Sequence, residues 1–124
     1  NSISELSNSV FAGATNLTEC IINGVTKVNY GSFYGCSSLV SVEINSLPII
    51  EYDTFNLCTS LTTVKANSAI QINTLAFYGC TSLTNIEFGK ALSVLGGAFM
   101  NCSNLYSISL PKATSILGST FMRC

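Results

Sequence analysis

The chain has 124 residues, of which 9% are charged and about a third are Ser, Thr or Asn, and its net charge at pH 7 is −1. This composition predicts one globular domain, and the lack of a basic patch or an acidic tail argues against DNA or RNA as partners. The uncharged runs 66–86 and 91–111 are long enough to span a membrane, but Ser, Thr, Asn and turn residues interrupt both, so we expect no membrane insertion.

Phenylalanine recurs at a fixed step along the whole chain. Six of the seven phenylalanines occupy positions 11, 33, 55, 77, 99 and 121, a step of 22 residues. Nearly the same seven residues begin at two of them, as FYGCSSL (33–39) and FYGCTSL (77–83). A fixed period of this kind is typical of arrays in which each unit stacks on its neighbours. We therefore expect one array over residues 1–124 with about five repeats and, since Asn1 falls in the middle of a repeat, a piece of a longer array.

The first predicted element of each repeat is a short helical turn around the phenylalanine. Phe and the Cys three residues later share one face if the chain turns helically there. Asp53 and Ser119 stand at capping positions before two of these turns. We expect both columns to be structural: Phe33, Phe55, Phe77 and Phe99, and Cys36, Cys58, Cys80 and Cys102.

The second predicted element is a short strand, centred about nine residues after each phenylalanine. Apolar and polar residues alternate there, as they do in 41–44, and this alternation is a strand pattern. Stacked repeats would place these strands side by side in parallel, about 4.8 Å apart. The sequence therefore predicts an α/β-type repeat solenoid with 22-residue repeats, a parallel β-sheet on the concave face and short helical turns on the convex face.

The repeat has a recognisable motif, Ala/Ser/Thr-Phe-x-x-Cys-x-x-Leu-x-x-Ile-x-Leu-Pro. Its parts are most complete in TFMRC (120–124) and CSNLYSISLP (102–111), and its copies run in phase along essentially the whole chain. The motif resembles the BspA-like, or Treponema-type, leucine-rich repeats. The resemblance implies a leucine-rich repeat solenoid of a bacterial or protist surface protein that works by adhesion or ligand binding, and it supplies no catalytic residues.

Six cysteines raise the question of disulfides, a metal site or a nucleophile. Five share one column, so an odd number cannot all pair, and Cys20 lies in a strand column that otherwise holds Val or Ile. The chain has no His and no CxxC, which argues against zinc binding and against an activated thiol. We expect the cysteines to be small apolar core residues, with a disulfide between adjacent coils as the alternative, and we expect no cofactor or metal.

The residues that alternate with the strand core positions are predicted to point outward and are the candidate ligand-binding residues. Glu43 and Glu87 could act as a general acid and base, but Lys65 lies on the strand between them, so we interpret the three as a cross-strand ion ladder. The full set is Glu19, Ile21, Ser41, Glu43, Thr63, Lys65, Asn85, Glu87, Ser107 and Ser109.

Tyrosines flanking the repeat elements form a second candidate partner surface, although tyrosine also packs at solenoid rims. They are Tyr30, Tyr34, Tyr52, Tyr78 and Tyr106. No phosphate-binding loop or nucleophile motif is present, so we do not expect an enzyme. We expect a non-enzymatic interaction or adhesion module of a cell-surface or secreted protein that binds a protein or glycan ligand through the concave face. The alternative is a structural spacer or assembly element whose coils stack end to end or on neighbouring subunits.

Overall fold

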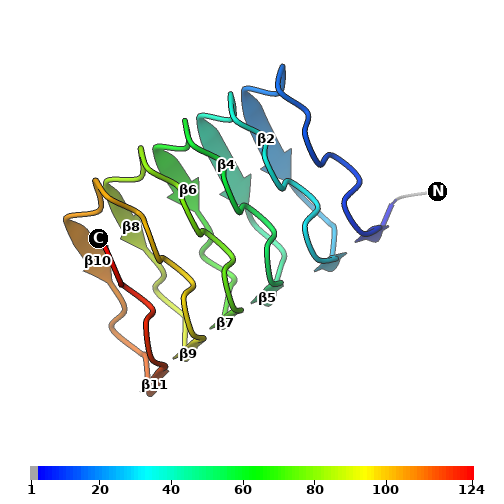
Figure 1. The fold of residues 1–124 in the computed structure, drawn as a ribbon. Helices are drawn as coiled ribbons and strands as arrows, with labels where there is room; N and C mark the ends of the chain where they lie inside the picture. Colours follow the sequence, from blue (N-terminus) through cyan, green and yellow to red (C-terminus); the bar gives the residue numbers. More distant parts are fainter. Residues whose placement is uncertain (1–2) are drawn as a thin grey trace.

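The computed structural model describes residues 3–124 as one stack of coils (Figure 1). Each strand pairs in parallel with a strand of the next coil, 22 residues further on, as Ser41 pairs with Thr63. A five-stranded sheet has the order β10-β8-β6-β4-β2, and a four-stranded sheet has the order β11-β9-β7-β5. Figure 1 shows the two rows of strands along opposite edges of the stack. The predicted solenoid of parallel strands with a 22-residue repeat is confirmed.

The strands of both sheets are short. The five-stranded sheet consists of β2 (Glu19–Ile22), β4 (Ser41–Ile44), β6 (Thr63–Lys65), β8 (Asn85–Glu87) and β10 (Ser107–Ser109). The four-stranded sheet consists of β5 (Ile49–Ile50), β7 (Gln71–Ile72), β9 (Ser93–Val94) and β11 (Ser115–Ile116). A separate pair joins β1 (Glu5–Leu6) to β3 (Lys27–Val28).

The predicted helical turns on the convex face are wrong, because residues 3–124 contain no helix. The residues two positions before and after each phenylalanine of the 22-residue series have left-handed backbone. Around Phe55 they are Asp53 (φ 57°) and Leu57 (φ 59°). A left-handed residue at every fourth position interrupts an α-helix. Asp53 and Ser119 (φ 62°) are for the same reason not helix caps, which have extended backbone.

The turn segments instead bond to one another from coil to coil. The backbone N–H of Gly31 donates to Tyr52 O (3.2 Å), that of Phe33 to Thr54 O (2.9 Å), and that of Gly35 to Asn56 O (2.8 Å). Within a coil, the N–H of Cys36 donates to Phe33 O at 3.2 Å. This tight turn brings Phe and Cys to the same side without a helix, which is why their spacing was misleading.

A ladder of phenylalanine rings forms the centre of the stack. Successive rings from Phe11 to Phe121 are stacked, with centroids 5.2–5.8 Å apart. Between these two ends the rings are fully buried, as at Phe33, Phe55 and Phe77. Stacked aromatic pairs add about 0.5–1.5 kcal/mol each to the burial of their area. The ladder therefore ties every coil to its neighbours.

The cysteine column runs beside the phenylalanine ladder. Cys36, Cys58, Cys80 and Cys102 are fully buried, and all six cysteines of the chain are free thiols. The Cys58 thiol donates to Phe33 O of the preceding coil at 3.2 Å, and the other members of the column make the equivalent bond. The thiol fills space and also donates a second hydrogen bond to a carbonyl that already accepts one from the backbone, a role that packing arguments alone did not include.

The end coils bury their core columns less completely than the inner coils do. Phe11 is 41% exposed at one end, and Ile116 and Leu117 are each 49% exposed at the other. The inner members of the Phe11 and Ile116 columns are buried, because a neighbouring coil covers them on both sides. Over residues 3–124 no helix is long and apolar enough to cross a membrane.

Candidate binding face

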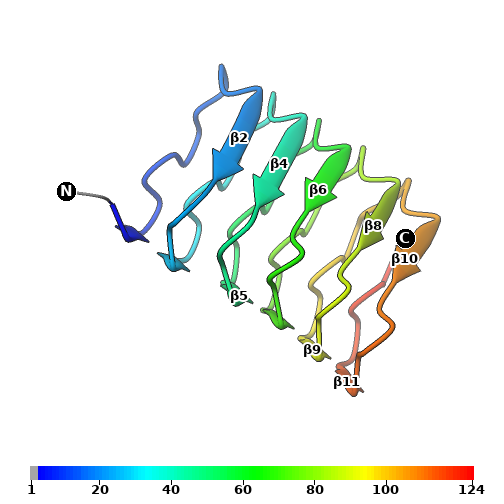
Figure 2. The same ribbon diagram turned by 180° about the vertical axis from the view of Figure 1, so that it is seen from behind.

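The outer surface of the five-stranded sheet, here called the sheet face, carries the candidate ligand-binding residues. Figure 2 views the molecule from this side, with β2 to β10 side by side in front. Within each strand the outward residues are exposed or half-buried, while the inward residues of the three inner strands, Val42, Val64 and Ile86, are buried. The sheet face comprises Glu19, Ile21, Ser41, Glu43, Thr63, Lys65, Asn85, Glu87, Ser107 and Ser109.

The strand register arranges these side chains in two rows that cross the strands. One row is Ile21, Glu43, Lys65, Glu87 and Ser109, in which every residue pairs with the next. The other row contains Glu19, Ser41 and Thr63 at one end and Asn85 and Ser107 at the other. Aligned side chains of neighbouring coils can therefore act together on one ligand.

The predicted ion ladder of Glu43, Lys65 and Glu87 is not formed, although the register places Lys65 between the two glutamates. Across the described part of the chain, the salt bridge between Lys27 and Glu5 (3.3 Å) stands alone. Glu43 Oε1 instead accepts a hydrogen bond from Asn45 Nδ2 at 2.9 Å. Exposed ion pairs contribute only about 0–1 kcal/mol, so little favours bringing these side chains together. The charges of the row remain accessible to a partner.

Two shallow hollows interrupt the sheet face, and Lys65 borders both. The first, of about 110 Å³, is lined by side chains of β2, β4 and β6, including Glu19, Glu43 and Lys65. The second, of about 330 Å³, lies between Thr63, Lys65, Asn85 and Glu87 and is also lined by Asn67. Both are at or below the lower end of the roughly 300–1,000 Å³ range of enclosed small-molecule pockets. Their size suits contact with a larger partner.

Asn67 is a lining residue that was not among the sequence candidates. It follows β6 in the column that holds Asn23 and Asn45 in earlier coils. Asn45 Nδ2 donates to Asn23 Oδ1 at 2.7 Å, so two members of this column bond between coils. The repeated asparagine was a signal that the residues directly after the strands belong to the same surface.

The thiols do not provide reactive groups for this face. Burial, with a smaller contribution from Cys36, raises the pKa of Cys58 to about 12. Burial raises the pKa of Cys20, which lies in β2, to about 11. A thiol with so high a pKa stays protonated near neutral pH and is a poor nucleophile. Within residues 3–124 no group of three or more His, Cys, Asp or Glu side chains could hold a metal ion.

The tyrosines are divided among separate places instead of forming one surface. Tyr30 and Tyr52 are stacked on each other on the turn segments, with centroids 5.1 Å apart. Tyr106 is 80% exposed and directly precedes β10. Tyr78 is half-buried, and its hydroxyl accepts a hydrogen bond from Asn101 Nδ2 at 2.9 Å. Only the Tyr30–Tyr52 stack forms a continuous exposed aromatic surface.

Comparisons with known proteins agree with this architecture. Residues 1–124 match, in six copies, the family model described as the BspA type leucine rich repeat region. The crystal structure of a leucine-rich repeat protein from Bacteroides ovatus ATCC 8483 is similar to this chain, with a TM-score of 0.91 and 35% sequence identity. The match covers 98% of this chain and 32% of that one, so this chain spans about a third of the length of that relative. No curated protein matches this chain.

Proposed function

The chain belongs to the BspA-type leucine-rich repeat family, and on that premise we propose that it is a non-enzymatic adhesion module of a cell-surface or secreted protein. Its ligand, a protein or a glycan, binds on the sheet face. Leucine-rich repeat arrays typically serve as interaction scaffolds, because a stacked sheet offers an extended surface without needing a closed pocket.

The observation that carries the proposal is the contrast between the inward and the outward columns of the sheet. The inward column reads Cys20, Val42, Val64, Ile86 and Ile108, and it is apolar throughout. The outward row changes from Ile21 through three alternating charges to Ser109. Packing explains the apolar column, whereas the aligned and accessible residues of the variable row match what specific recognition needs.

Removing the central side chains of the sheet face tests the proposal. The variant Thr63→Ala/Lys65→Ala/Glu87→Ala removes the two side chains that line both hollows, Thr63 and Lys65, together with Glu87 of the larger hollow. We expect the intact chain to capture at least one member of a panel of immobilised extracellular-matrix proteins and glycans. The variant should bind that ligand about tenfold more weakly or worse, which corresponds to a loss of about 1.4 kcal/mol or more.

The matched control changes exposed charges away from the strands. Lys90→Ala/Lys112→Ala removes two exposed lysines in loops that follow β8 and β10, and it should leave capture unchanged. Equal capture by the intact chain and by the triple variant, with both folded by circular dichroism, would show that the sheet face is not the binding surface.

Assembly by stacking is the second function that we propose, and the exposed core columns of the end coils favour it. Ile116 in the last coil presents an apolar side chain that a further coil of the same type would cover, as it does at Ile50, Ile72 and Val94. Stacking predicts that the apparent mass of the 124-residue chain rises with concentration in analytical ultracentrifugation. A monomer of constant mass over a hundredfold range of concentration would contradict it.

A further inference from the structure

An aromatic stack on the turn segments stops in the middle of the molecule. The rings of Tyr30 and Tyr52 lie 5.1 Å apart with an interplanar angle of 3°, and both are more than 40% exposed. The same column continues as Thr74, Gly96 and Gly118, one residue per coil. A ring at position 74, one coil beyond Tyr52, would continue the stack. The chain has Thr74 there, so no ring covers the far side of Tyr52.

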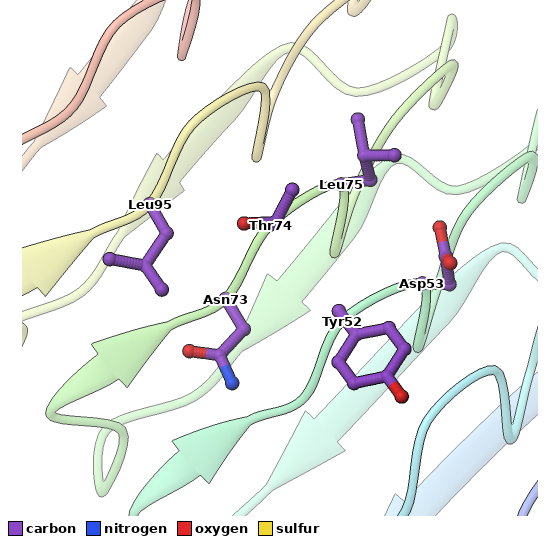
Figure 3. A pocket seen from close by; sticks show the side chains of 6 residues that line it. All are labelled: Tyr52, Asp53, Asn73, Thr74, Leu75 and Leu95. Carbon is purple, nitrogen blue, oxygen red and sulfur yellow. The ribbon is translucent and has the colours of Figure 1, made fainter.

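A hollow of about 230 Å³ occupies this place (Figure 3). Its lining residues come from the coil of Tyr52 and from the next two coils, so it lies on the side of Tyr52 that faces away from Tyr30. We call it the tyrosine hollow, and its lining is Tyr52, Asp53, Asn73, Thr74, Leu75 and Leu95. Because it is smaller than a typical drug-sized pocket, it suits a single ring.

The polar groups at the edge of the tyrosine hollow are held in place. Asn56, only 7% exposed, donates from Nδ2 to Asp53 Oδ1 at 2.6 Å and so orients the carboxylate. Asn73 accepts from Gln71 Nε2 at 2.6 Å and donates to Glu51 Oε2 at 2.8 Å. This leaves Asp53 Oδ2 as an acceptor and the exposed Thr74 hydroxyl as a donor or acceptor for a ligand.

The apolar walls complete the hollow and keep its shape. The Leu75 side chain covers Gly97 of the next coil, where an added Cβ would lie 2.9 Å from Leu75 Cδ2. Leu95 is half-buried and stands beyond Asn73 in Figure 3. A ring entering beside Tyr52 thus meets an aromatic side chain, two leucines, one oriented carboxylate and one hydroxyl.

We propose that the tyrosine hollow binds one pyranose ring of a glycan, stacked on Tyr52 with its hydroxyls on Asp53 and Thr74. A pyranose presents C–H groups on its face and hydroxyls at its rim. The negative face of an aromatic ring attracts the C–H groups, and a carboxylate accepts strong hydrogen bonds from hydroxyls. Both kinds of partner are present at the hollow, which lies on the turn segments and not on the sheet face.

Two other occupants would use only part of this arrangement. A partner's aromatic or proline side chain would stack on Tyr52 but leave Asp53 Oδ2 desolvated without a hydrogen bond. An arginine could stack on Tyr52 and pair with Asp53, but Asp53 is only half-buried, and an ion pair open to solvent contributes about 0–1 kcal/mol. The neutral, hydroxyl-rich ring fits the set of groups best.

Saturation-transfer NMR on the whole chain tests the proposal. The probes are methyl glycosides of glucose, galactose, mannose and N-acetylglucosamine, with arginine amide and a proline dipeptide as the competing ligand types. We expect at least one glycoside to receive saturation from the chain. In spectra of the labelled chain, the same glycoside should shift the backbone amide signals of Tyr52, Asp53 and Thr74. Tyr52→Ala should weaken its Kd about tenfold, by analogy with the loss of a stacking platform in other ligand sites.

A second variant and a control separate loss of the site from loss of the fold. Thr74→Tyr places a ring on the next step of the stack, so it should abolish glycoside binding while keeping or raising the Tm. Tyr106→Ala removes a tyrosine that is 80% exposed and lies outside the hollow, and it should change nothing. The sheet-face triple variant should also retain glycoside binding, so this proposal and the sheet-face proposal can fail separately.

Three results would overturn the proposal. The first is no saturation transfer to any glycoside. The second is equal binding by the intact chain and by the folded Thr74→Tyr variant. The third is a response to arginine amide or the proline dipeptide in place of the glycosides, which would assign the hollow to a protein side chain.

Discussion

Replacing one phenylalanine of the central ladder by alanine should destabilise the protein by an amount that depends on its coil. Phe77 is fully buried, with ring centroids 5.3 Å from Phe55, 5.2 Å from Phe99 and 6.0 Å from Phe88. Removing a buried phenylalanine ring costs about 3–5 kcal/mol. Because three aromatic neighbours lose their partner, we expect Phe77→Ala to fall near the upper end, at about 4–5 kcal/mol.

The same substitution in the first coil serves as the comparison. Phe11 occupies the same column, but it is 41% exposed and stacks on Phe33 alone, at 5.3 Å. With about half the burial and one ring contact, Phe11→Ala should cost about 1–2 kcal/mol. The structure thus predicts a difference of about 3 kcal/mol between two chemically identical changes in equivalent positions.

Guanidinium denaturation followed by far-UV circular dichroism measures both losses. A domain of this size has a free energy of unfolding of roughly 6–19 kcal/mol, so both variants should retain a measurable native baseline. If Phe11→Ala and Phe77→Ala lowered the free energy of unfolding equally, the ladder would not be the element that couples the coils. The reasoning from neighbour number would then be refuted.

Three further predictions concern single columns of the stack. In a thermal melt, Gly97→Ala should lower stability by about 1–2 kcal/mol, because Gly97 has φ 71° and an added Cβ would lie 2.9 Å from Leu75 Cδ2. Gly89→Ala is the control: the space around Gly89 is open, so the same melt should show almost no change. In the native chain a thiol reagent should label the exposed Cys124 well before the buried Cys58 and Cys80, and equal labelling rates by mass spectrometry would contradict the packing. Stability should fall as the pH rises above 9.0, because unfolded thiols ionise there while burial keeps Cys58 and Cys102 protonated up to a pKa of about 12. Cys58→Ala should flatten that fall by about 1.4 kcal/mol per pH unit, and an unchanged slope would refute the raised pKa.

The sheet face could be predicted from the sequence because its two signals reinforce each other. Alternation within 41–44 identifies a strand, and the 22-residue step aligns that strand with its copies. Together they predict the residues that share a row, and the register of Glu43 with Lys65 and of Lys65 with Glu87 is as expected. The salt bridges of that row could not be predicted, because exposed side chains choose among partners of nearly equal energy.

The backbone conformation of the turn segments could not be predicted from periodicity. A three-residue spacing of Phe33 and Cys36 fits a helical turn and also fits a tight turn between two left-handed residues. Glycines at positions 31 and 35 indicated left-handed backbone on both sides of Phe33. In the next coil, leucine occupies position 57, the equivalent of 35, so the sequence does not show that this backbone is left-handed too. The four-stranded sheet was not predicted, because a two-residue strand such as β7 is too short to show an alternation of apolar and polar residues.

The tyrosine hollow could be found only in the structure. Tyr30 and Tyr52 are recognisable as one column in the sequence, yet nothing there shows that they stack or that a hollow follows them. The hollow exists because Thr74 and Gly96 carry no aromatic ring where Tyr30 and Tyr52 do. Its polar edge depends on how Asn56 orients Asp53. Such a site combines three coils that the repeat pattern treats as equivalent.

The binding surface itself is the central claim, and mapping the footprint of a captured ligand tests it most directly. Backbone amide signals of the labelled chain would be recorded with and without a matrix protein fragment that the chain captures. The account predicts that the largest shifts lie in β4, β6 and β8, around Thr63, Lys65 and Glu87. Shifts confined to the turn segments or to the end coils, with β4 to β8 unchanged, would contradict it.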